Sequence, residues 1–211
     1  MSEPVHISEP LFAVMKEIKE PMDNANEKHM VVYCDGAAEP TNPGPMGAGY
    51  VLQDADGKQI EARGYYLGHG SNNVAEYMGV IRAVEAAIRL GATRLDVRCD
   101  SQLIVKQVLG LWVINAPHLQ PLRDKAVGLL NQIDRWDLEW IPRERNSRAD
   151  VCANNAALFR RDVDYTGREI LNTRDDSRAE RVRAATGDYF KQHRGDWTPH
   201  HRKPQFRKKG Q

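Results

Sequence analysis

Asp35 is an acidic residue in an unexpected place. It follows the apolar run "MVVYC", which is typical of a buried β-strand, and a lone carboxylate inside such a strand carries a desolvation cost unless a partner or a cation offsets it. Glu76, Asp100 and Asp150 lie at the ends of other expected elements. If all four carboxylates meet in one cleft, hard divalent cations such as Mg²⁺ would neutralise them, and two such ions can clamp the attacking and leaving oxygens of a phosphodiester.

Helix capping is the simpler explanation for three of these acids. Asn73 followed three residues later by Glu76, and Ser147 followed by Asp150, both approach a capping box. Asp100 directly precedes an expected helix and would cap it. Capping does not explain the acid inside the strand, so convergence on a metal site is the hypothesis that accounts for the whole set.

Hydrophobic periodicity and turn signals predict the elements that position the acids. Alternating residues predict three successive strands, after which the period changes to that of a helix ending before Gly91. The sequence therefore predicts an α/β fold with a mixed five-stranded sheet, three antiparallel strands and then two parallel ones, flanked by helices. The expected strands are 30–37, 47–54, 59–68, 92–101 and 135–142, and the expected helices are 73–90, 101–109, 118–133 and 147–161.

Length and charge indicate one compact domain with an extension at each end. The chain has 211 residues, with 30 Lys and Arg against 29 Asp and Glu. We expect an N-terminal extension or linker over 1–28, the catalytic domain over 29–163, and a basic, flexible extension over 164–211. No apolar run approaches the roughly 18–20 residues of a membrane helix, and the start lacks a secretory pattern. The prediction is a cytoplasmic protein without a membrane partner.

The C-terminal extension is rich in positive charge. Residues 191–211 contain seven Lys or Arg against one Asp, together with Trp197 and Phe206. Cationic groups that displace counterions and rings that stack on bases suit nucleic acid. A solvated tail that serves solubility alone is the alternative, and the sequence leaves both open.

Three cysteines, Cys34, Cys99 and Cys152, have spacings that suit neither a disulfide framework nor a zinc site. Each lies near an acidic residue, so a redox role beside the acids is one hypothesis. The other is that they are small buried hydrophobic side chains.

Four strings carry a resemblance to a known family: "DGAAEPTNPGPMGAGYVL", "SNNVAEYMGVIRAVEAAIRLGA", "DSQLIVKQVLG" and "WIPRERNSRADVCANNAA". Over about residues 29–161 the chain resembles type 1 ribonuclease H, and most closely its bacterial and archaeal branch. The ordered acids, with "SNN" before the glutamate and "DSQ" at the third acid, make the resemblance specific.

The resemblance implies a ribonuclease H-like fold and an endoribonuclease that hydrolyses the RNA strand of RNA–DNA hybrids. Cleavage would use two Mg²⁺ ions, with Mn²⁺ as a substitute, and would leave 5′-phosphate and 3′-hydroxyl ends. It implies that the catalytic, metal-binding residues are Asp35, Glu76, Asp100 and Asp150. The expected partner is an RNA–DNA hybrid, with double-stranded RNA as a further candidate substrate, and the expected state is a monomer.

The resemblance also implies a set of substrate contacts. Asn73, with backbone groups around Gly36, would contact ribose 2′-hydroxyls, since an amide can both donate to and accept from that group. Gln102 would reach the minor groove, and Ser71 would help to hold a DNA phosphate. The full expected set is Gly36, Asn42, Ser71, Asn72, Asn73 and Gln102. An N-cap role for Asn73 remains an alternative.

The chain departs from the family pattern in two places. The loop before the last acid reads "PRERNSR" and has no histidine, so Glu144 or Arg145 are auxiliary candidates, although neither has the near-neutral pKa of an imidazole. The segment "LGLWVINAPHL" is short where some relatives insert a basic protrusion that grips the hybrid. Lys106, Trp112 and the basic tail are candidates for that grip, and burial of Trp112 in the core is the alternative.

Two further classes of function remain open from the sequence. One is a nucleic-acid-binding module of this fold without catalysis, against which the complete acidic set argues. The other is a different nuclease or recombinase of the same superfamily. Proofreading exonucleases pair Asp-x-Glu on the first strand, whereas Gly36 and Ala37 follow the acid here.

Overall fold

A computed structural model describes residues 27–167 and 170 of the chain. Its elements follow the predicted order. They are β1 (His29–Ala38), β2 (Gly44–Asp54), β3 (Gln59–Gly70), α2 (Asn72–Arg89), β4 (Arg94–Cys99), α3 (Gln102–Val108), the 3₁₀ turn η1 (Pro117–Leu119), α4 (Gln120–Leu130), β5 (Arg135–Trp140), the 3₁₀ turn η2 (Arg143–Arg145), α5 (Ser147–Phe159) and β6 (Val163–Asp164).

The sheet is mixed, as predicted, with strand order β5-β4-β1-β2-β3-β6. β1 pairs antiparallel with β2, which pairs antiparallel with β3, whereas β1, β4 and β5 run parallel. The sheet has a sixth strand where five were predicted. This strand, β6, is two residues long and pairs with β3, and so short a strand leaves no periodic signal in the sequence.

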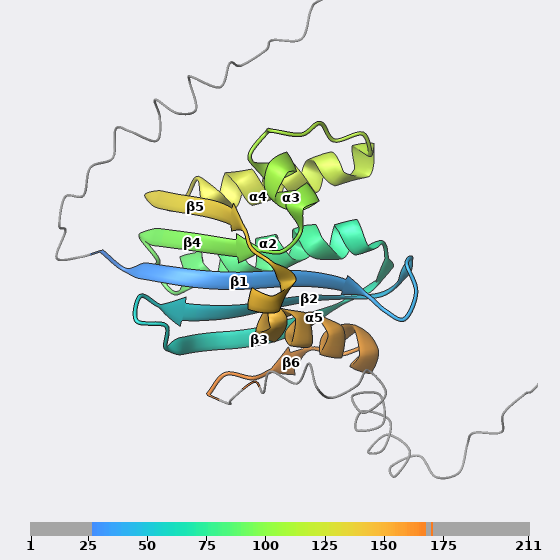
Figure 1. Cartoon of the computed structure of the whole chain (residues 1–211), viewed down its shortest axis with the longest axis horizontal. Helices are drawn as coiled ribbons and strands as arrows, with labels where there is room; N and C mark the ends of the chain where they lie inside the picture. The colour runs from blue at the N-terminus through green and yellow to red at the C-terminus, as the bar shows by residue number, and fades with distance from the viewer. Residues whose placement is uncertain (1–26, 168–169, 171–211) are drawn as a thin grey trace, which may run out of the picture.

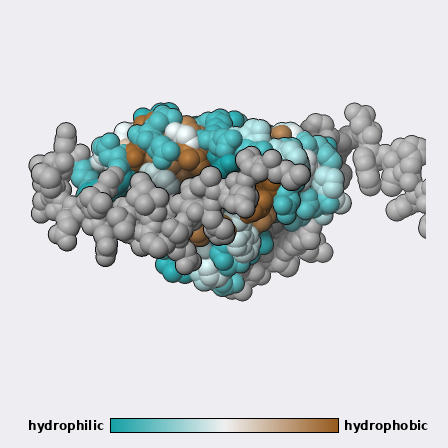
Figure 2. Space-filling view, turned by 90° about the horizontal axis from the view of Figure 1, so that it is seen from above, coloured by the Kyte–Doolittle hydropathy of each residue, from teal (hydrophilic) through white to brown (hydrophobic). Residues whose placement is uncertain are grey.

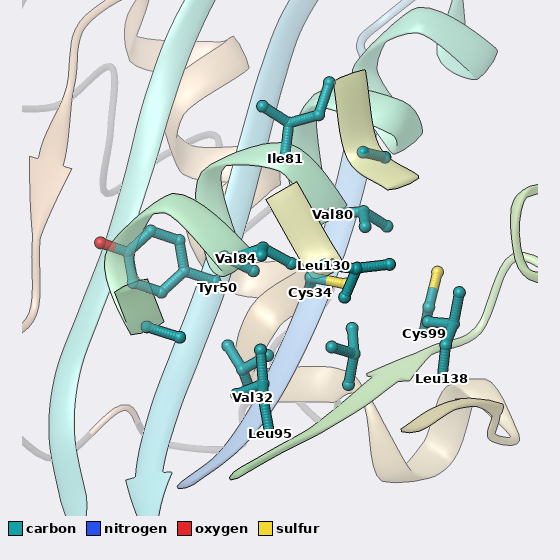
Figure 3. Packing of buried hydrophobic residues seen from close by; sticks show 14 of the residues in the cluster. Val32, Cys34, Tyr50, Val80, Ile81, Val84, Leu95, Cys99, Leu130 and Leu138 are labelled. Carbon is teal, nitrogen blue, oxygen red and sulfur yellow. The ribbon is translucent and has the colours of Figure 1, made fainter. Parts of the chain in front are cut away.

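Helices cover the two faces of the sheet unequally (Figure 1). α2 and α4 pack on one face, which we call the α2 side, and the main hydrophobic core lies between them and the strands (Figure 3). Val32, Tyr50 and Val84 belong to this core. α5 alone packs across β1, β2 and β3 on the other face, the α5 side, over a smaller cluster that includes Val51 and Cys152.

The helix starts correct the capping interpretation of the acids. Ser71 is the N-cap of α2, and its Oγ accepts a hydrogen bond from the Val74 N–H at 3.4 Å, so Asn73 already lies inside the helix. The N-cap residues of α3 and α5 are Ser101 and Asn146, and in the described part of the chain neither makes a side-chain capping bond. The predicted capping roles of Asp100 and of the Ser147 box are therefore wrong, which leaves the acids free for another role.

The folded unit is longer than the predicted 29–163. The Tyr165 N–H donates to the Ala62 carbonyl at 2.8 Å, and Ile170 is buried in the cluster on the α5 side. At the other end, the Lys28 N–H donates to Thr93 Oγ1 at 2.8 Å. The contacts of the domain therefore include residues before 29 and after 163, while the rest of both predicted extensions lies outside the described residues.

The three cysteines are all buried, which confirms that they are small core side chains. Cys34 and Cys99 belong to the core on the α2 side, and Cys152 lies on the α5 side. Burial raises the pKa of the Cys152 thiol to about 12, which disfavours a reactive thiolate there.

Most of the coloured surface in Figure 2 is hydrophilic, with apolar residues between the polar ones. The exposed large apolar side chains of the described region are Leu111, Trp112, Val113 and Trp140. Trp112 is 43% exposed, so its predicted burial in the core is wrong. No helix within residues 27–167 combines the length and the apolar character needed to cross a bilayer.

Candidate functional site

Asp35, Glu76 and Asp100 line one hollow of about 210 Å³. They come from β1, from α2 and from the end of β4. Asp150, in the first turn of α5, is nine-tenths buried beside them and raises the pKa of Asp35 by its charge. The structure therefore brings together all four acids that the sequence predicted, from four different elements.

Two glycines let β1 and α2 approach closely enough to bring their acids together. A Cβ atom placed on Gly36 would lie 2.0 Å from the Glu76 backbone nitrogen, and one on Gly79 would lie 2.4 Å from the Asp35 carbonyl oxygen. Real Cβ atoms do not make contacts this short. Backbone therefore packs against backbone at this point, and the close approach places Asp35 opposite the first turn of α2.

Burial and mutual repulsion act on the acids of the hollow. Burial raises the pKa of Asp35 well above its usual range, and the nearby charges of Glu76, Asp100 and Asp150 raise it further, while Arg143 opposes them. Burial likewise raises the pKa of Glu76, with additional contributions from Cys99 and Asp100. A cation that enters such a site offsets the repulsion between the carboxylates and stabilises their charged forms.

The donor set fits a divalent metal ion. Glu76 Oε2 is buried and accepts no hydrogen bond from any residue that the structure describes, so its lone pairs are available for an ion. Cys99 Sγ and carboxylate oxygens of Glu76 and Asp100 all lie within 4.8 Å of one another. Carboxylate oxygens are the ligands that hard divalent cations prefer.

Arg143 is a site residue that the sequence reasoning missed. Its Nη2 donates to Asp150 Oδ1 at 2.5 Å, and Arg143 lines the hollow although its side chain is 66% exposed. The expected auxiliaries Glu144 and Arg145 are exposed and are not among the described residues that line the hollow. The loop has three arginines in six residues, and no spacing signal separates the first from the others.

Asn146 and Trp140 fix the position of Asp100, and neither was predicted. The buried Asn146 Nδ2 donates to Asp100 Oδ1 at 2.8 Å and to the Cys34 carbonyl at 2.9 Å, which links β4 to β1. The Trp140 indole N–H donates to the Asp100 carbonyl at 3.0 Å, while its ring is 48% exposed. The only sequence signal for Asn146 was its position inside a matched family string.

The predicted substrate residues fall into two groups. Gly36 and Asn72 line the hollow, whereas Asn42 and Ser71 are not among the described residues that line it. Asn42 follows β1 and accepts a hydrogen bond from Asn72, and Ser71 caps α2. Asn72 Nδ2 donates to Glu76 Oε1 at 3.2 Å, its Oδ1 accepts from the Ala38 N–H, and its own N–H donates to Asn42 Oδ1. These contacts make Asn72 a support of the Glu76 carboxylate.

Asn73 and Gln102 form the second group. Both are exposed, and they lie in the first turns of α2 and α3. Their side chains are therefore accessible to a bound molecule.

Comparisons with known proteins agree with this geometry. A family model described as "Reverse transcriptase-like" matches residues 33–156. A ribonuclease HI of Halobacterium salinarum is 43% identical over 124 residues, which is 59% of this chain and 62% of the relative. A bifunctional protein of Mycobacterium tuberculosis is 41% identical over 128 residues, 60% of this chain and 35% of that protein. The chain thus spans less than two thirds of the length of these relatives.

Solved structures match the same region. The crystal structure of the Halobacterium ribonuclease H1 superposes with a TM-score of 0.59 at 41% identity, over 61% of this chain and 96% of that one. LC11 ribonuclease H1, crystallised with an RNA/DNA hybrid, gives a TM-score of 0.57 at 35% identity, over 61% of this chain and 96% of that one.

A mixed sheet that gathers four carboxylates between its two helical layers defines the ribonuclease H-like class of fold. Within that class, the chain belongs to the type 1 ribonuclease H family. Enzymes of this family use divalent metal ions, and the acidic cluster provides suitable ligands for them.

Proposed function

We propose that the protein is an endonuclease that hydrolyses the RNA strand of RNA–DNA hybrids, leaving 5′-phosphate and 3′-hydroxyl ends. The observation that carries the proposal is the convergence of Asp35, Glu76, Asp100 and Asp150, from four elements, around one hollow. The names of the relatives and the hybrid bound to LC11 ribonuclease H1 support this choice of substrate.

The four acids would hold two Mg²⁺ ions, and Mn²⁺ would be an effective substitute because it also accepts oxygen ligands. When bound, such ions supply Lewis-acid stabilisation of the charge that develops on the phosphodiester oxygens. The raised pKa values of Asp35 and Glu76 and the unpartnered Glu76 Oε2 support this assignment.

The protein's own residues orient these acids and add positive charge. Asn72 holds one oxygen of Glu76, and Asn146 holds one oxygen of Asp100, so both carboxylates present a fixed lone pair to the hollow. Arg143 stays protonated at any physiological pH, so it supplies charge to a phosphate but cannot act as a general base.

Recognition of RNA would come from the edge of the hollow. Asn73 and Gln102 are exposed in the first turns of α2 and α3, and Gly36 lines the hollow. An amide that meets a 2′-hydroxyl separates RNA from DNA without reading bases. We therefore propose cleavage of internal RNA stretches with little sequence preference.

Grip on the hybrid would come from outside the hollow. Lys106 Nζ lies 4.7 Å from the centre of the exposed Trp112 ring, so this pair presents a cation and an aromatic face on one surface. The basic tail, outside the described residues, is the second proposed contact, and its share of binding should weaken as salt rises.

Labelled substrates of one sequence test the proposal. An RNA–DNA hybrid should be cut internally in Mg²⁺ and left intact in EDTA, and DNA duplex should remain intact in both. A short RNA run embedded in DNA should be cut poorly, because several consecutive 2′-hydroxyls are needed. Binding without cleavage would indicate a binding module, and comparable cutting of DNA would indicate another nuclease of the superfamily.

Double-stranded RNA of the same sequence should be included in that assay, because it is the further candidate substrate. The proposal also includes action as a monomer in the cytoplasm. Size-exclusion chromatography with light scattering and fractionation of the source cells would test these two points.

A further inference from the structure

Cys99 places a sulfur atom beside two of the proposed metal ligands. Its Sγ and one carboxylate oxygen from each of Glu76 and Asp100 all lie within 4.8 Å of one another. The thiol is fully buried at the end of β4, on the α2 side of the sheet. Hydrolysis supported by Mg²⁺ has no use for this sulfur, since Mg²⁺ prefers oxygen ligands.

Two features of this group of atoms favour the binding of an ion. Glu76 Oε2 is buried without a hydrogen-bond partner among residues 27–167 and 170, because Asn72 occupies only Oε1. The Ser101 N–H donates to Cys99 Sγ at 3.4 Å, which holds the sulfur in place beside the two carboxylates. An unpartnered carboxylate oxygen within reach of a sulfur atom suits a cation that binds both oxygen and sulfur.

We propose that Cys99, Glu76 and Asp100 form a second metal site that binds thiophilic divalent cations of the Zn²⁺ and Cd²⁺ type. Zinc takes cysteine sulfur at about 2.3 Å and carboxylate oxygen at about 2.0–2.2 Å, often with four ligands in all. On binding, the S–H bond breaks, the proton leaves to solvent, and a sulfur–metal bond forms without any change of oxidation state.

The ion would enter through the hollow, which Glu76 and Asp100 line. Because it takes both carboxylates, a bound thiophilic ion and the hydrolytic ions exclude one another. The consequence is inhibition of RNA cleavage by Zn²⁺ or Cd²⁺, and this consequence alone rests on the proposed function. Binding itself is a property of the three side chains.

Cadmium absorption tests the site without any substrate. CdCl₂ added to the reduced full-length protein should produce the ultraviolet sulfur-to-cadmium charge-transfer band, which histidine or carboxylate ligands do not give. The distinction matters because the chain also contains His200 and His201, which bind such metals through nitrogen. The band should disappear in Cys99→Ser and persist in the matched control Cys152→Ser, a buried thiol on the other side of the sheet.

Competition tests whether the carboxylates take part. Glu76→Gln should weaken the binding of Cd²⁺ at least about tenfold, since mutation of even a supporting residue of a metal site lowers affinity by this much. Excess Mg²⁺ should reduce the band in the parent. The proposal is overturned if the parent shows no band, if Cys99→Ser keeps it, or if Mg²⁺ leaves it unchanged. Cys99→Ala serves as a second variant should the serine protein fold poorly.

Inhibition is measured with the hybrid in excess Mg²⁺. Micromolar Cd²⁺ or Zn²⁺ should inhibit the parent and Cys152→Ser, and the concentration for half inhibition should rise at least about tenfold in Cys99→Ser. Equal inhibition of Cys99→Ser would overturn the inhibitory role. A parent that fails to cut hybrid in Mg²⁺ alone would contradict the proposed function and leave the cadmium band as a separate result.

Discussion

The two sides of the sheet contribute to the same hollow in different ways. The α2 side has the large core and supplies Glu76, whose buried Oε2 has no hydrogen-bond partner among the described residues. The α5 side has a small cluster and supplies Asp150, whose carboxylate already accepts a hydrogen bond from Arg143. The α2 side therefore supplies a carboxylate oxygen without a partner, whereas the α5 side supplies a carboxylate that is paired with a cationic side chain.

Neutralising the acids should have the largest effect. Asp35→Asn and Asp150→Asn should each lower Mg²⁺-dependent cleavage at least about a hundredfold, because a lost metal ligand costs more than a lost supporting residue. Hybrid binding should be largely retained. Turnover of labelled hybrid and binding in Ca²⁺ measure the two effects. Cleavage within about tenfold of the parent would remove that acid from the catalytic set.

The same two variants should differ in their effect on stability. Without metal, Asp35→Asn should keep or raise the melting temperature, because it removes a buried charge that its neighbours repel. Asp150→Asn should lower it slightly, since Arg143 loses a charged acceptor. Thermal melting in EDTA measures the difference. Equal shifts in both variants would show that an acid without a paired cation and the acid paired with Arg143 do not differ in this way.

Loss of Arg143 should have an intermediate effect. Arg143→Gln removes one charge-assisted hydrogen bond to Asp150 and a positive charge that lowers the pKa of Asp35. We expect cleavage to fall about tenfold, in keeping with the free energy of one such bond. The pH at which activity rises should move upward. Arg145→Gln is the matched control, because Arg145 is exposed two residues away and should leave the pH profile in place.

Metal-free stability should depend on pH through Asp35 and Glu76. Both carboxyls have a raised pKa in the folded protein, so the folded state binds their protons more tightly than the unfolded chain does. Their stabilising contribution is complete below the unfolded carboxyl pKa of about 4 and is lost as pH rises through the folded values. The melting temperature in EDTA should therefore decline as pH rises, and Mg²⁺ should reverse this decline. Glu76→Gln should make the dependence on pH shallower.

Truncation of the chain at two positions should have the smallest effect. It tests how much Ile170 adds to the stability of the small cluster on the α5 side. A chain that stops after Ile170 should melt like the full chain. One that stops after Asp164 lacks a buried isoleucine, so its free energy of unfolding should be lower by about 2 kcal/mol. Both should show a raised Michaelis constant at low salt if the basic tail binds hybrid. Equal melting of the two chains would mean that Ile170 contributes nothing to the fold.

The sequence predicted the acids because their signals are local. Asp35 interrupts a strand pattern, and the other three lie at predictable element ends, so the fold follows once the strands are placed. Arg143 and Asn146 could not be predicted, since the geometry of a loop decides which polar side chain turns inward. Similarly, three successive cap-forming residues precede Val74, and only the backbone determines that Ser71 caps the helix.

Exposure was harder to predict than position. Trp112 is large and apolar, as core residues often are. Its ring nevertheless lies at the surface, where only Lys106 is recorded against it among the described residues. Ile170 shows the reverse case, an isolated apolar residue that becomes buried through a short return of the chain along β3.

Gly36 and Gly79 give the hollow a fixed dimension. At this point main chain rests on main chain, and the separation of β1 and α2 is as small as atomic radii permit. Flexible side chains elsewhere in the core can repack without altering that separation. The backbone itself thus sets the spacing between the acid of β1 and the acid of α2. A methyl group at either glycine would push the two elements apart and move the two carboxylates away from each other.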